Sequence, residues 1–235
     1  MGAGNVSSRV VRFRSLPRPQ IALGLIVFAI MTFGLWEISE GISGREPATF
    51  ADSEISAWLH NHARQPITTG MFVVTTFGST QWVSWLAAAF IAYFIVRRRF
   101  YWVLAFASSV FGGMLLNKLL KYFFHRTRPF FQDPLLTLTS YSFPSGHTMM
   151  ATVLYGVIAA YLLSRTNDWR LRLLIILAAA ILIPLIAFSR VYLGAHYLTD
   201  VLGAMAEGLA WLSLCLTTTF SIWRYRRTPA NKNAG

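Results

Sequence analysis

The sequence predicts an all-α protein, a bundle of six transmembrane helices with a short amphipathic helix between the first and second. The first observation is composition: of 235 residues, 55% are hydrophobic and 15% aromatic, and only 13% are charged. An ordinary soluble domain is less apolar. The second is a series of six apolar stretches, each near the roughly 20 residues that a helix needs to cross a bilayer. The third is that Lys and Arg occur in short groups between them.

The apolar stretches define the expected helices in order. They cover residues 20–40, 70–96, 100–122, 147–164, 172–189 and 198–222. One such stretch could be a buried helix of a soluble protein, but six in series favour a membrane. The first is interpreted as a retained helix, because it is long and lacks a clear small-residue cleavage site after it. We expect a membrane domain over 20–223, with a basic tail at 1–19 and a basic, disordered tail at 224–235.

The segment between the first two stretches has a different character. Residues 41–69 contain acidic, polar and aromatic side chains, among them Glu46, Asp52 and Trp58. This mixture is typical of a helix that lies along a membrane surface, with one face in lipid and the other in water. We expect such a helix over 51–62, at the outer interface.

The distribution of positive charge predicts the orientation. Six spans place alternate connections on the same side, and fourteen of the 21 Lys and Arg residues fall on the side of the two tails. Lys and Arg near helix ends are retained preferentially on the cytoplasmic side. Both termini should therefore be cytoplasmic in a protein of the plasma membrane. The net charge of +12 fits anionic lipid better than nucleic acid, because no single basic face is formed.

Three groups of polar residues interrupt this pattern, all on the predicted outer side. They occur at 121–129, where the third stretch ends, at 144–147, where the fourth begins, and at 189–200, between the fifth and sixth. Ionisable residues at membrane level are costly, and they commonly mark a functional site. We therefore expect one extracytoplasmic active site at this end of the bundle.

The residue types in these groups suit a phosphoryl group. Lys121, Arg128 and Arg190 supply cations, and arginine presents a planar fork of donors to phosphate oxygens. Ser145 and Gly146 open a helix, whose first N–H groups are unpaired and attract anions. Glycine lets the backbone approach a ligand closely. These five residues are predicted to bind phosphate.

The remaining three residues suit the chemical step. The spacing of His196 and Asp200 places both on one face of a helical turn, where a carboxylate fixes the imidazole tautomer. A histidine held in this way can act as a nucleophile. His147 is then available to protonate the departing oxygen.

Other interpretations of the same residues are open. Lys121, Arg126 and Arg128 could be a solvated helix end, and His196 with Asp200 could be a structural hydrogen bond. His147, His196 and Asp200 could also form a two-histidine, one-carboxylate metal site, although three nearby cations would repel a divalent ion. The single cysteine, Cys215, supplies no thiolate cluster. We therefore expect no metal and no cofactor.

The three groups resemble the signature of the type 2 phosphatidic acid phosphatase family, which shares its site with the vanadium haloperoxidases. The family's pattern has a Lys and, seven residues later, an Arg-Pro pair, here Lys121 and Arg128-Pro129. Pro-Ser-Gly-His follows at 144–147, and Ser189-Arg190 precedes a His and an Asp at 196 and 200. All three parts match without a substitution.

The resemblance implies a lipid phosphatase that needs no metal. Lys121, Arg128, Ser145, Gly146, His147 and Arg190 would bind the phosphate, while His196 forms a phosphohistidine that Asp200 orients. His147 would be the general acid. The substrates it suggests are undecaprenyl pyrophosphate, phosphatidylglycerol phosphate and phosphatidic acid, with a slight preference for the first.

Alternatives to hydrolysis come from the same resemblance and from the spans. They are a lipid phosphotransferase, a vanadate-dependent haloperoxidase, which in that group resembles a soluble protein, and a membrane transporter. A transporter predicts ionisable residues throughout the membrane depth, whereas Glu207 is the main deep one here. The oligomeric state cannot be predicted from one chain.

Overall fold

The computed structural model describes residues 19–43 and 47–227, and in these ranges every regular element is helical. Of the tails predicted at 1–19 and 224–235, residues 1–18 and 228–235 lie outside the described residues. Residues 224–227 continue α9, so the prediction of disorder was wrong for that part of the second tail. The helices are α1 (Pro19–Ser43), α2 (Pro47–Asn61), α3 (Ile67–Thr76), α4 (Thr80–Val96), α5 (Phe100–Ala107), the π-helical turn η1 (Ser108–Gly112), α6 (Gly113–Phe124), α7 (Gly146–Leu163), α8 (Trp169–Tyr192) and α9 (Leu198–Arg227). The all-α prediction is confirmed.

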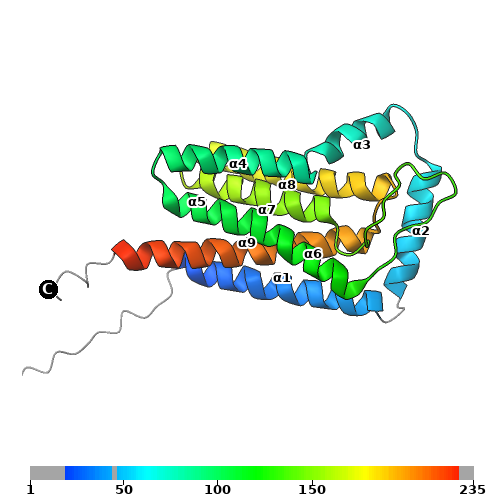
Figure 1. Ribbon diagram of the computed structural model, residues 1–235, viewed down its shortest axis with the longest axis horizontal. Coiled ribbons are helices and arrows are strands. Elements are labelled where there is room, and N and C mark those ends of the chain that lie inside the picture. The colour runs from blue at the N-terminus through cyan, green and yellow to red at the C-terminus, as the bar shows by residue number, and fades with distance from the viewer. Residues whose placement is uncertain (1–18, 44–46, 228–235) are drawn as a thin grey trace, which may run out of the picture.

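The long helices run side by side along one axis (Figure 1). α2 lies across one end of the bundle, where the loop between α6 and α7 and the junction of α8 and α9 also lie. The connections from α4 to α5 and from α7 to α8 lie at the opposite end. The fold therefore collects segments that are far apart in the sequence at the end covered by α2.

Six helical runs are long and apolar enough to cross a membrane, if the bent pair of α3 and α4 is taken as one span. This agrees with the six predicted spans, but the second is not a continuous helix over 70–96. It bends by 41° at the break between α3 and α4. Gly78 lies in that break, and a Cβ atom there would come within 2.9 Å of the His147 carbonyl oxygen. The close approach to α7 favours a break with glycine at this point.

The third span is also irregular. It consists of α5, η1 and α6 instead of one α-helix over 100–122. The indole Nε1 of Trp211, on α9, donates to the carbonyl oxygens of Ser108 and Ser109, at 3.0 and 3.1 Å. A side chain that takes up carbonyl groups inside a helix is a common cause of such a local change in winding.

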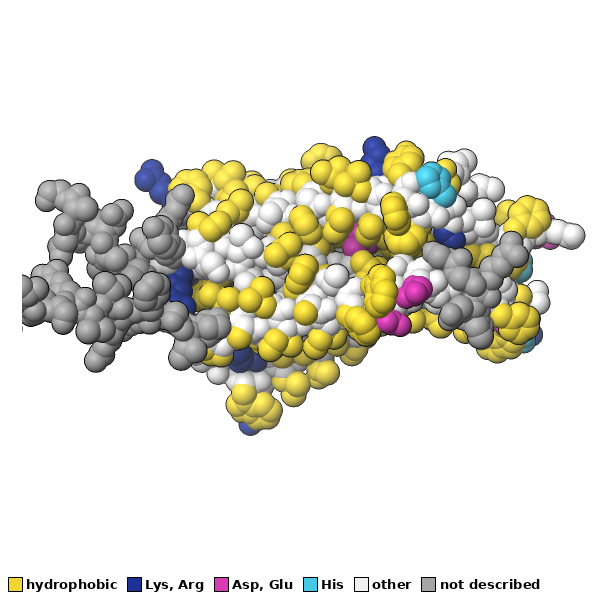
Figure 2. Space-filling view, turned by 90° about the horizontal axis from the view of Figure 1, so that it is seen from below, with side chains coloured by type: hydrophobic (Ala, Val, Ile, Leu, Met, Phe, Trp, Pro, Cys, Tyr) yellow, Lys and Arg dark blue, Asp and Glu magenta, His cyan; other side chains and the backbone are white. Residues whose placement is uncertain are grey.

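The outer surface of the bundle is apolar. Leu25, Phe33 and Trp85 are exposed although they are large hydrophobic residues, and no residue of the most apolar part of α1 is buried. In Figure 2 hydrophobic side chains cover much of the face between the two ends, while the histidines in view lie towards the end with α2. This surface is suited to lipid.

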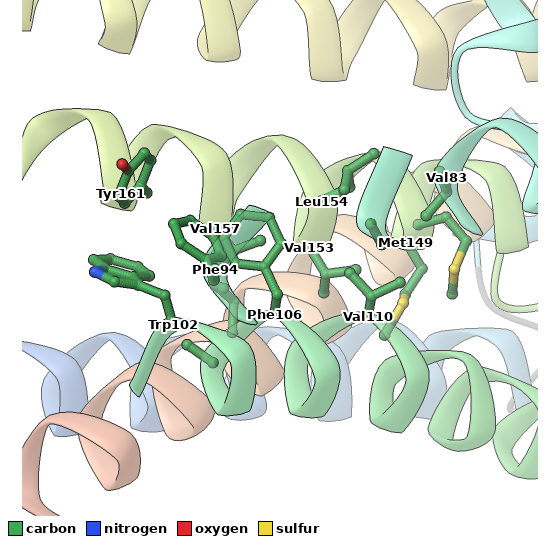
Figure 3. Packing of buried hydrophobic residues seen from close by; sticks show 14 of the residues in the cluster. Val83, Phe94, Trp102, Phe106, Val110, Met149, Val153, Leu154, Val157 and Tyr161 are labelled. Carbon is green, nitrogen blue, oxygen red and sulfur yellow. The ribbon is translucent and has the colours of Figure 1, made fainter. Parts of the chain in front are cut away.

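The interior core is formed mainly by α4, α5 and α7. Figure 3 shows Phe94, Phe106 and Tyr161 packed together, with Val110 and Met149 further along the bundle. The ring of Phe94 lies 5.3 Å from that of Phe106 and 4.9 Å from that of Tyr161. Aromatic contacts thus hold together the half of the bundle near the α4–α5 turn.

The amphipathic helix predicted at 51–62 is observed as α2, Pro47–Asn61. Asp52, Ser56 and Leu59 are buried against the bundle, whereas Phe50 and Trp58 are exposed. The buried face therefore contains a carboxylate as well as an apolar side chain, and that carboxylate has a partner in the site described next.

Candidate active site

The three polar groups of the sequence meet at the end of the bundle that α2 covers. Lys121 is on the last turn of α6, Ser145 and Gly146 open α7, and Arg190 is near the end of α8. Arg128, Lys121 and Arg190 all lie within electrostatic range of His147. All eight predicted site residues lie at this end, on segments that the fold brings together.

Main-chain carbonyl groups hold two of the three cations. Lys121 Nζ donates to the carbonyl oxygen of Tyr141 at 2.7 Å. Arg128 donates from Nε to the carbonyl oxygen of Ser140 at 2.7 Å and from Nη2 to its hydroxyl at 2.9 Å. The loop 125–145 therefore fixes both side chains by neutral contacts that leave their charge uncompensated.

Arg190 is held differently. Its side chain is buried at 3% exposure, and Nη1 donates to the hydroxyl of Thr75 on α3 at 2.8 Å. Its Nε is buried without a hydrogen-bond partner. A buried guanidinium with an unused donor is costly unless an anion binds beside it.

No carboxylate of the described residues forms an ion pair with Lys121, Arg128 or Arg190. Among the described residues, Asp52 and Asp200 pair with Arg126 instead, and Asp200 also lies 3.4 Å from His196 Nδ1. Burial lowers the pKa of Arg128, but a guanidinium stays protonated in proteins. The site therefore has an excess of positive charge, which an anionic group can neutralise.

The start of α7 adds donors to this site. Ser145 is the N-cap residue, but its side chain makes no capping hydrogen bond to the first turn. A Cβ atom on Gly146 would lie 4.0 Å from Lys121 Cε and 3.5 Å from Asn117 Oδ1. The open helix start thus lies directly beside the Lys121 side chain, as the predicted anion cradle requires.

His196 lies in the turn before α9, which begins at Leu198. The prediction that His196 and Asp200 share a face of one helical turn was therefore wrong in detail, although the two side chains do meet. His196 Nδ1 lies 3.4 Å from Asp200 Oδ2, and Ser142 donates its hydroxyl to the same carboxylate oxygen. Asp200 is therefore held by Ser142 of the loop 125–145 as well as by His196. The spacing of His196 and Asp200 in the sequence does not indicate this third residue.

The tautomer of His196 follows from its other neighbour. Its Nε2 lies 3.2 Å from Arg128 Nη1, and because arginine only donates, Nε2 accepts. The ring proton is then on Nδ1, facing Asp200. Burial lowers the pKa of His196 to about 3, an effect that Asp200 only partly opposes. At neutral pH the ring is uncharged, with a lone pair directed towards the cations.

Sequence reasoning gave no role to Arg126 or Asp52. Arg126 donates to Asp200 Oδ1 at 2.6 Å and to Asp52 Oδ2 at 2.8 Å, and the backbone N–H of Thr199 donates to Asp52 at 3.0 Å. This network fastens α2 to the carboxylate behind His196. The sequence did contain one indication of this role: Asp52 is an acidic residue on the buried face of the amphipathic helix α2.

Glu207, on α9, lies deeper in the bundle than Lys121 and the other site residues. It is 1% exposed, and its Oε2 accepts from Asn117 Nδ2 at 2.9 Å. Its other oxygen is buried without a partner. Asn117 is one turn from Lys121 and borders Gly146, so this polar pair lies beneath the site and not along a path through the bundle.

The two-histidine, one-carboxylate metal alternative finds no support in the arrangement. Across the described ranges, no group of three or more His, Cys, Asp or Glu side chains comes together that could hold a metal ion. The oxygens of Asp200 accept from Arg126, Ser142 and the backbone N–H of Tyr197. Its lone pairs are thus already used.

The fold and this arrangement of charges define a class of multi-pass membrane proteins with a cationic, histidine-containing site at one end of a helical bundle. The chain belongs to the PAP2 superfamily, whose sequence profile matches residues 102–224. This region includes all eight predicted site residues. The resemblance found in the sequence is thereby confirmed.

Curated relatives carry related names. The chain is 41% identical over 120 residues to phosphatidylglycerophosphatase B of Bacillus subtilis, which covers 50% of this chain and 59% of that protein. It is 33% identical over 143 residues to decaprenylphosphoryl-5-phosphoribose phosphatase of Mycolicibacterium smegmatis, covering 59% of this chain and 71% of the other. The match therefore spans less than two thirds of the first relative's length.

A solved structure supports the fold over a longer range. The crystal structure of a transmembrane PAP2-type phosphatidylglycerolphosphate phosphatase from Bacillus subtilis superposes with a TM-score of 0.70 at 27% identity. The comparison covers 89% of this chain and 98% of the other. The six-span bundle is thus an arrangement shared with a membrane phosphatase.

Proposed function

We propose that this protein is a membrane lipid phosphatase that cleaves a phosphomonoester or pyrophosphate through a phosphohistidine on His196. One observation carries the proposal. Lys121, Arg128 and Arg190 lie near His147, and Lys121 and Arg128 also lie near His196. None of the three cations forms an ion pair with a carboxylate of the described residues. A phosphate group is the anion that such a set of donors suits best.

In the first step the lone pair of His196 Nε2 attacks phosphorus. The bond from phosphorus to the leaving oxygen breaks, and His147 gives that oxygen a proton. The Nδ1 proton of His196 faces Asp200, which stabilises the positive charge that develops on the ring. Lys121 and the arginines neutralise the equatorial oxygens.

In the second step water attacks the phosphorus of the phosphohistidine. His147, now deprotonated, takes a proton from that water, and the bond from phosphorus to Nε2 breaks. Inorganic phosphate leaves and His196 returns to its neutral form. The cycle uses side chains alone, and a lipid hydroxyl in place of water would give a phosphotransferase.

A groove beside the site favours a lipid substrate. It lies between α2, α8 and α9, has a volume of about 610 Å³ and is lined mainly by apolar side chains, among them Trp58, Pro184 and Met205. Val191 and Leu198 also line it, and these residues are close in sequence to Arg190 and His196. An alkyl chain in the groove would leave its head group at the cations.

Phosphatidylglycerol phosphate is the first substrate to test, because the names of the Bacillus relative and of the superposed structure both refer to it. A polyprenyl phosphate or pyrophosphate is the second, favoured by the decaprenyl lipid in the name of the Mycolicibacterium relative. The function is tested by measuring phosphate release with and without excess chelator. The substrates would be phosphatidylglycerol phosphate, a decaprenyl phosphate, undecaprenyl pyrophosphate and phosphatidic acid. Release that requires a divalent ion, or none from any lipid, would contradict it.

We further propose that the site faces the extracytoplasmic side of the membrane and that both termini are cytoplasmic. The positive charges predict this orientation. Single cysteines introduced in the loop 125–145 of a Cys215→Ser protein should react with a membrane-impermeant thiol reagent added to intact cells. Labelling only after the cells are opened would reverse the orientation.

A further inference from the structure

A large cavity lies at the other end of the bundle. It has a volume of about 1030 Å³ and is formed by α1, α5, the end of α7 and α9. Its walls are mostly apolar and include Leu23, Val27, Trp102, Leu216 and Phe220. These residues belong to spanning helices, so the cavity opens where acyl chains surround the protein.

Three arginines line the same cavity. Arg98 and Arg99 come from the α4–α5 turn, and Arg165 follows the end of α7. Arg98 adopts a positive φ of 53°, a conformation that non-glycine residues rarely take. The backbone N–H of Arg99 donates to Phe94 at 2.8 Å. The turn therefore places two consecutive arginines beside the apolar walls.

No acidic side chain of the described residues forms an ion pair with these three arginines. None of the lining residues is acidic. Asp168, in the α7–α8 connection at the same end, accepts from the backbone N–H of Arg170 at 2.9 Å and does not line the cavity. The positive charge that lines the cavity is therefore available to an anionic ligand.

We propose that this cavity binds an anionic phospholipid, with its phosphate against Arg98, Arg99 and Arg165 and an acyl chain along α1 and α9. The combination of features selects the ligand. Free phosphate would use the arginines but not the apolar walls, and a neutral lipid would use the walls but not the arginines. Polybasic groups at a membrane surface attract anionic lipid. This site is separate from the active site and lies at the opposite end of the bundle.

Lipid retention measured by native mass spectrometry tests the proposal. The protein would be equilibrated with phosphatidylglycerol or phosphatidylcholine, since phosphatidylglycerol is a phosphodiester and so no substrate of a monoesterase. The triple variant R98Q/R99Q/R165Q should retain at least about tenfold less phosphatidylglycerol, because it removes the three cations that attract the anionic head group. Retention of phosphatidylcholine should stay within about twofold.

A matched control separates a site from general charge. The triple variant R97Q/R170Q/R172Q removes the same charge at the same end of the bundle, but none of its residues lines the cavity. It should retain phosphatidylglycerol within about twofold of the unchanged protein. An equal loss in both triple variants would overturn the proposal, as would displacement of the lipid by inorganic phosphate alone.

A third variant covers the case in which the arginine variant fails to fold. Val27→Trp fills part of the cavity without changing the charge, and it too should lower phosphatidylglycerol retention. Unchanged phosphatidylglycerol retention in a folded Val27→Trp protein would contradict the proposed position of the acyl chain along α1. Phosphate release from the lipid substrate should remain within about twofold in folded variants, because these residues are remote from the active site.

Discussion

The two ends of this bundle are held together by different interactions. Near the α4–α5 turn, Phe94, Phe106 and Tyr161 pack ring against ring in a dry core. At the end covered by α2, buried charged groups such as Arg126 and Asp200 are held by hydrogen bonds and ion pairs. If the proposed site carries the chemistry, substitutions at the aromatic end should affect mainly stability and substitutions at the polar end mainly turnover.

The largest effect is expected from His196→Ala. Removing the nucleophile should lower phosphate release by about 10⁴-fold or more, because the covalent step is lost. Thermal unfolding in detergent should change little, since the ring is held mainly by polar contacts. A folded His196→Ala protein with normal turnover would show that the polar end has another nucleophile.

Phe94→Ala should have the opposite signature. It removes a fully buried ring from the aromatic cluster, which costs about 3–5 kcal/mol of unfolding free energy. Turnover per folded molecule should stay within about twofold, because the site is at the other end. Phe33→Ala, which removes an exposed ring, is the control and should leave the unfolding free energy almost unchanged.

Arg126→Gln tests the link between α2 and the site. It leaves the buried carboxylates of Asp52 and Asp200 without their cation, and Asp200 then holds His196 less well. We expect about a hundredfold loss of turnover, with little change in substrate affinity. Lys118→Gln removes an exposed charge on the neighbouring helix and should have no comparable effect. Equal losses in both variants would mean that overall charge matters, not this network.

Acidic pH should weaken the polar end specifically. An unfolded histidine binds a proton below about pH 6.5, whereas folded His196 does so only near pH 3. The unfolded chain therefore binds more protons between these values, and stability falls as the pH falls. From pH 7.5 to 5.5 this histidine should cost about 1.4 kcal/mol. Chemical unfolding of the unchanged protein and of His196→Ala at both values isolates the difference, and equal pH slopes would refute it.

The smallest effect is expected from Ser142→Ala. The hydroxyl of Ser142 donates to Asp200, and its loss should lower turnover by about tenfold through a less well oriented carboxylate. Ser140→Ala removes the hydroxyl that accepts from Arg128 and is the matched control in the same loop. Because that contact does not involve Asp200, its turnover should fall by less than that of Ser142→Ala.

The spans were predictable because an apolar helix of sufficient length is the simplest way to satisfy the backbone in lipid. The break at Gly78 was not, since it depends on close packing against His147 and Ile186. Local polarity likewise pointed to eight residues that the structure brings to one end of the bundle. The contact of Asp52 with Arg126 could not be predicted in this way. It joins residues 74 apart in the sequence, and it forms only because the fold places α2 across the end of the bundle.

A phosphohistidine on His196 can be sought directly. Brief exposure of the unchanged protein to a ³²P-labelled lipid phosphate, followed by a rapid quench in alkali, should leave label on the protein. We expect the label to be stable in alkali and labile in acid, as phosphohistidine is, and peptide mass spectrometry to place it on His196. Label on another residue, or full turnover by a His196→Ala protein without any label, would contradict the proposed mechanism.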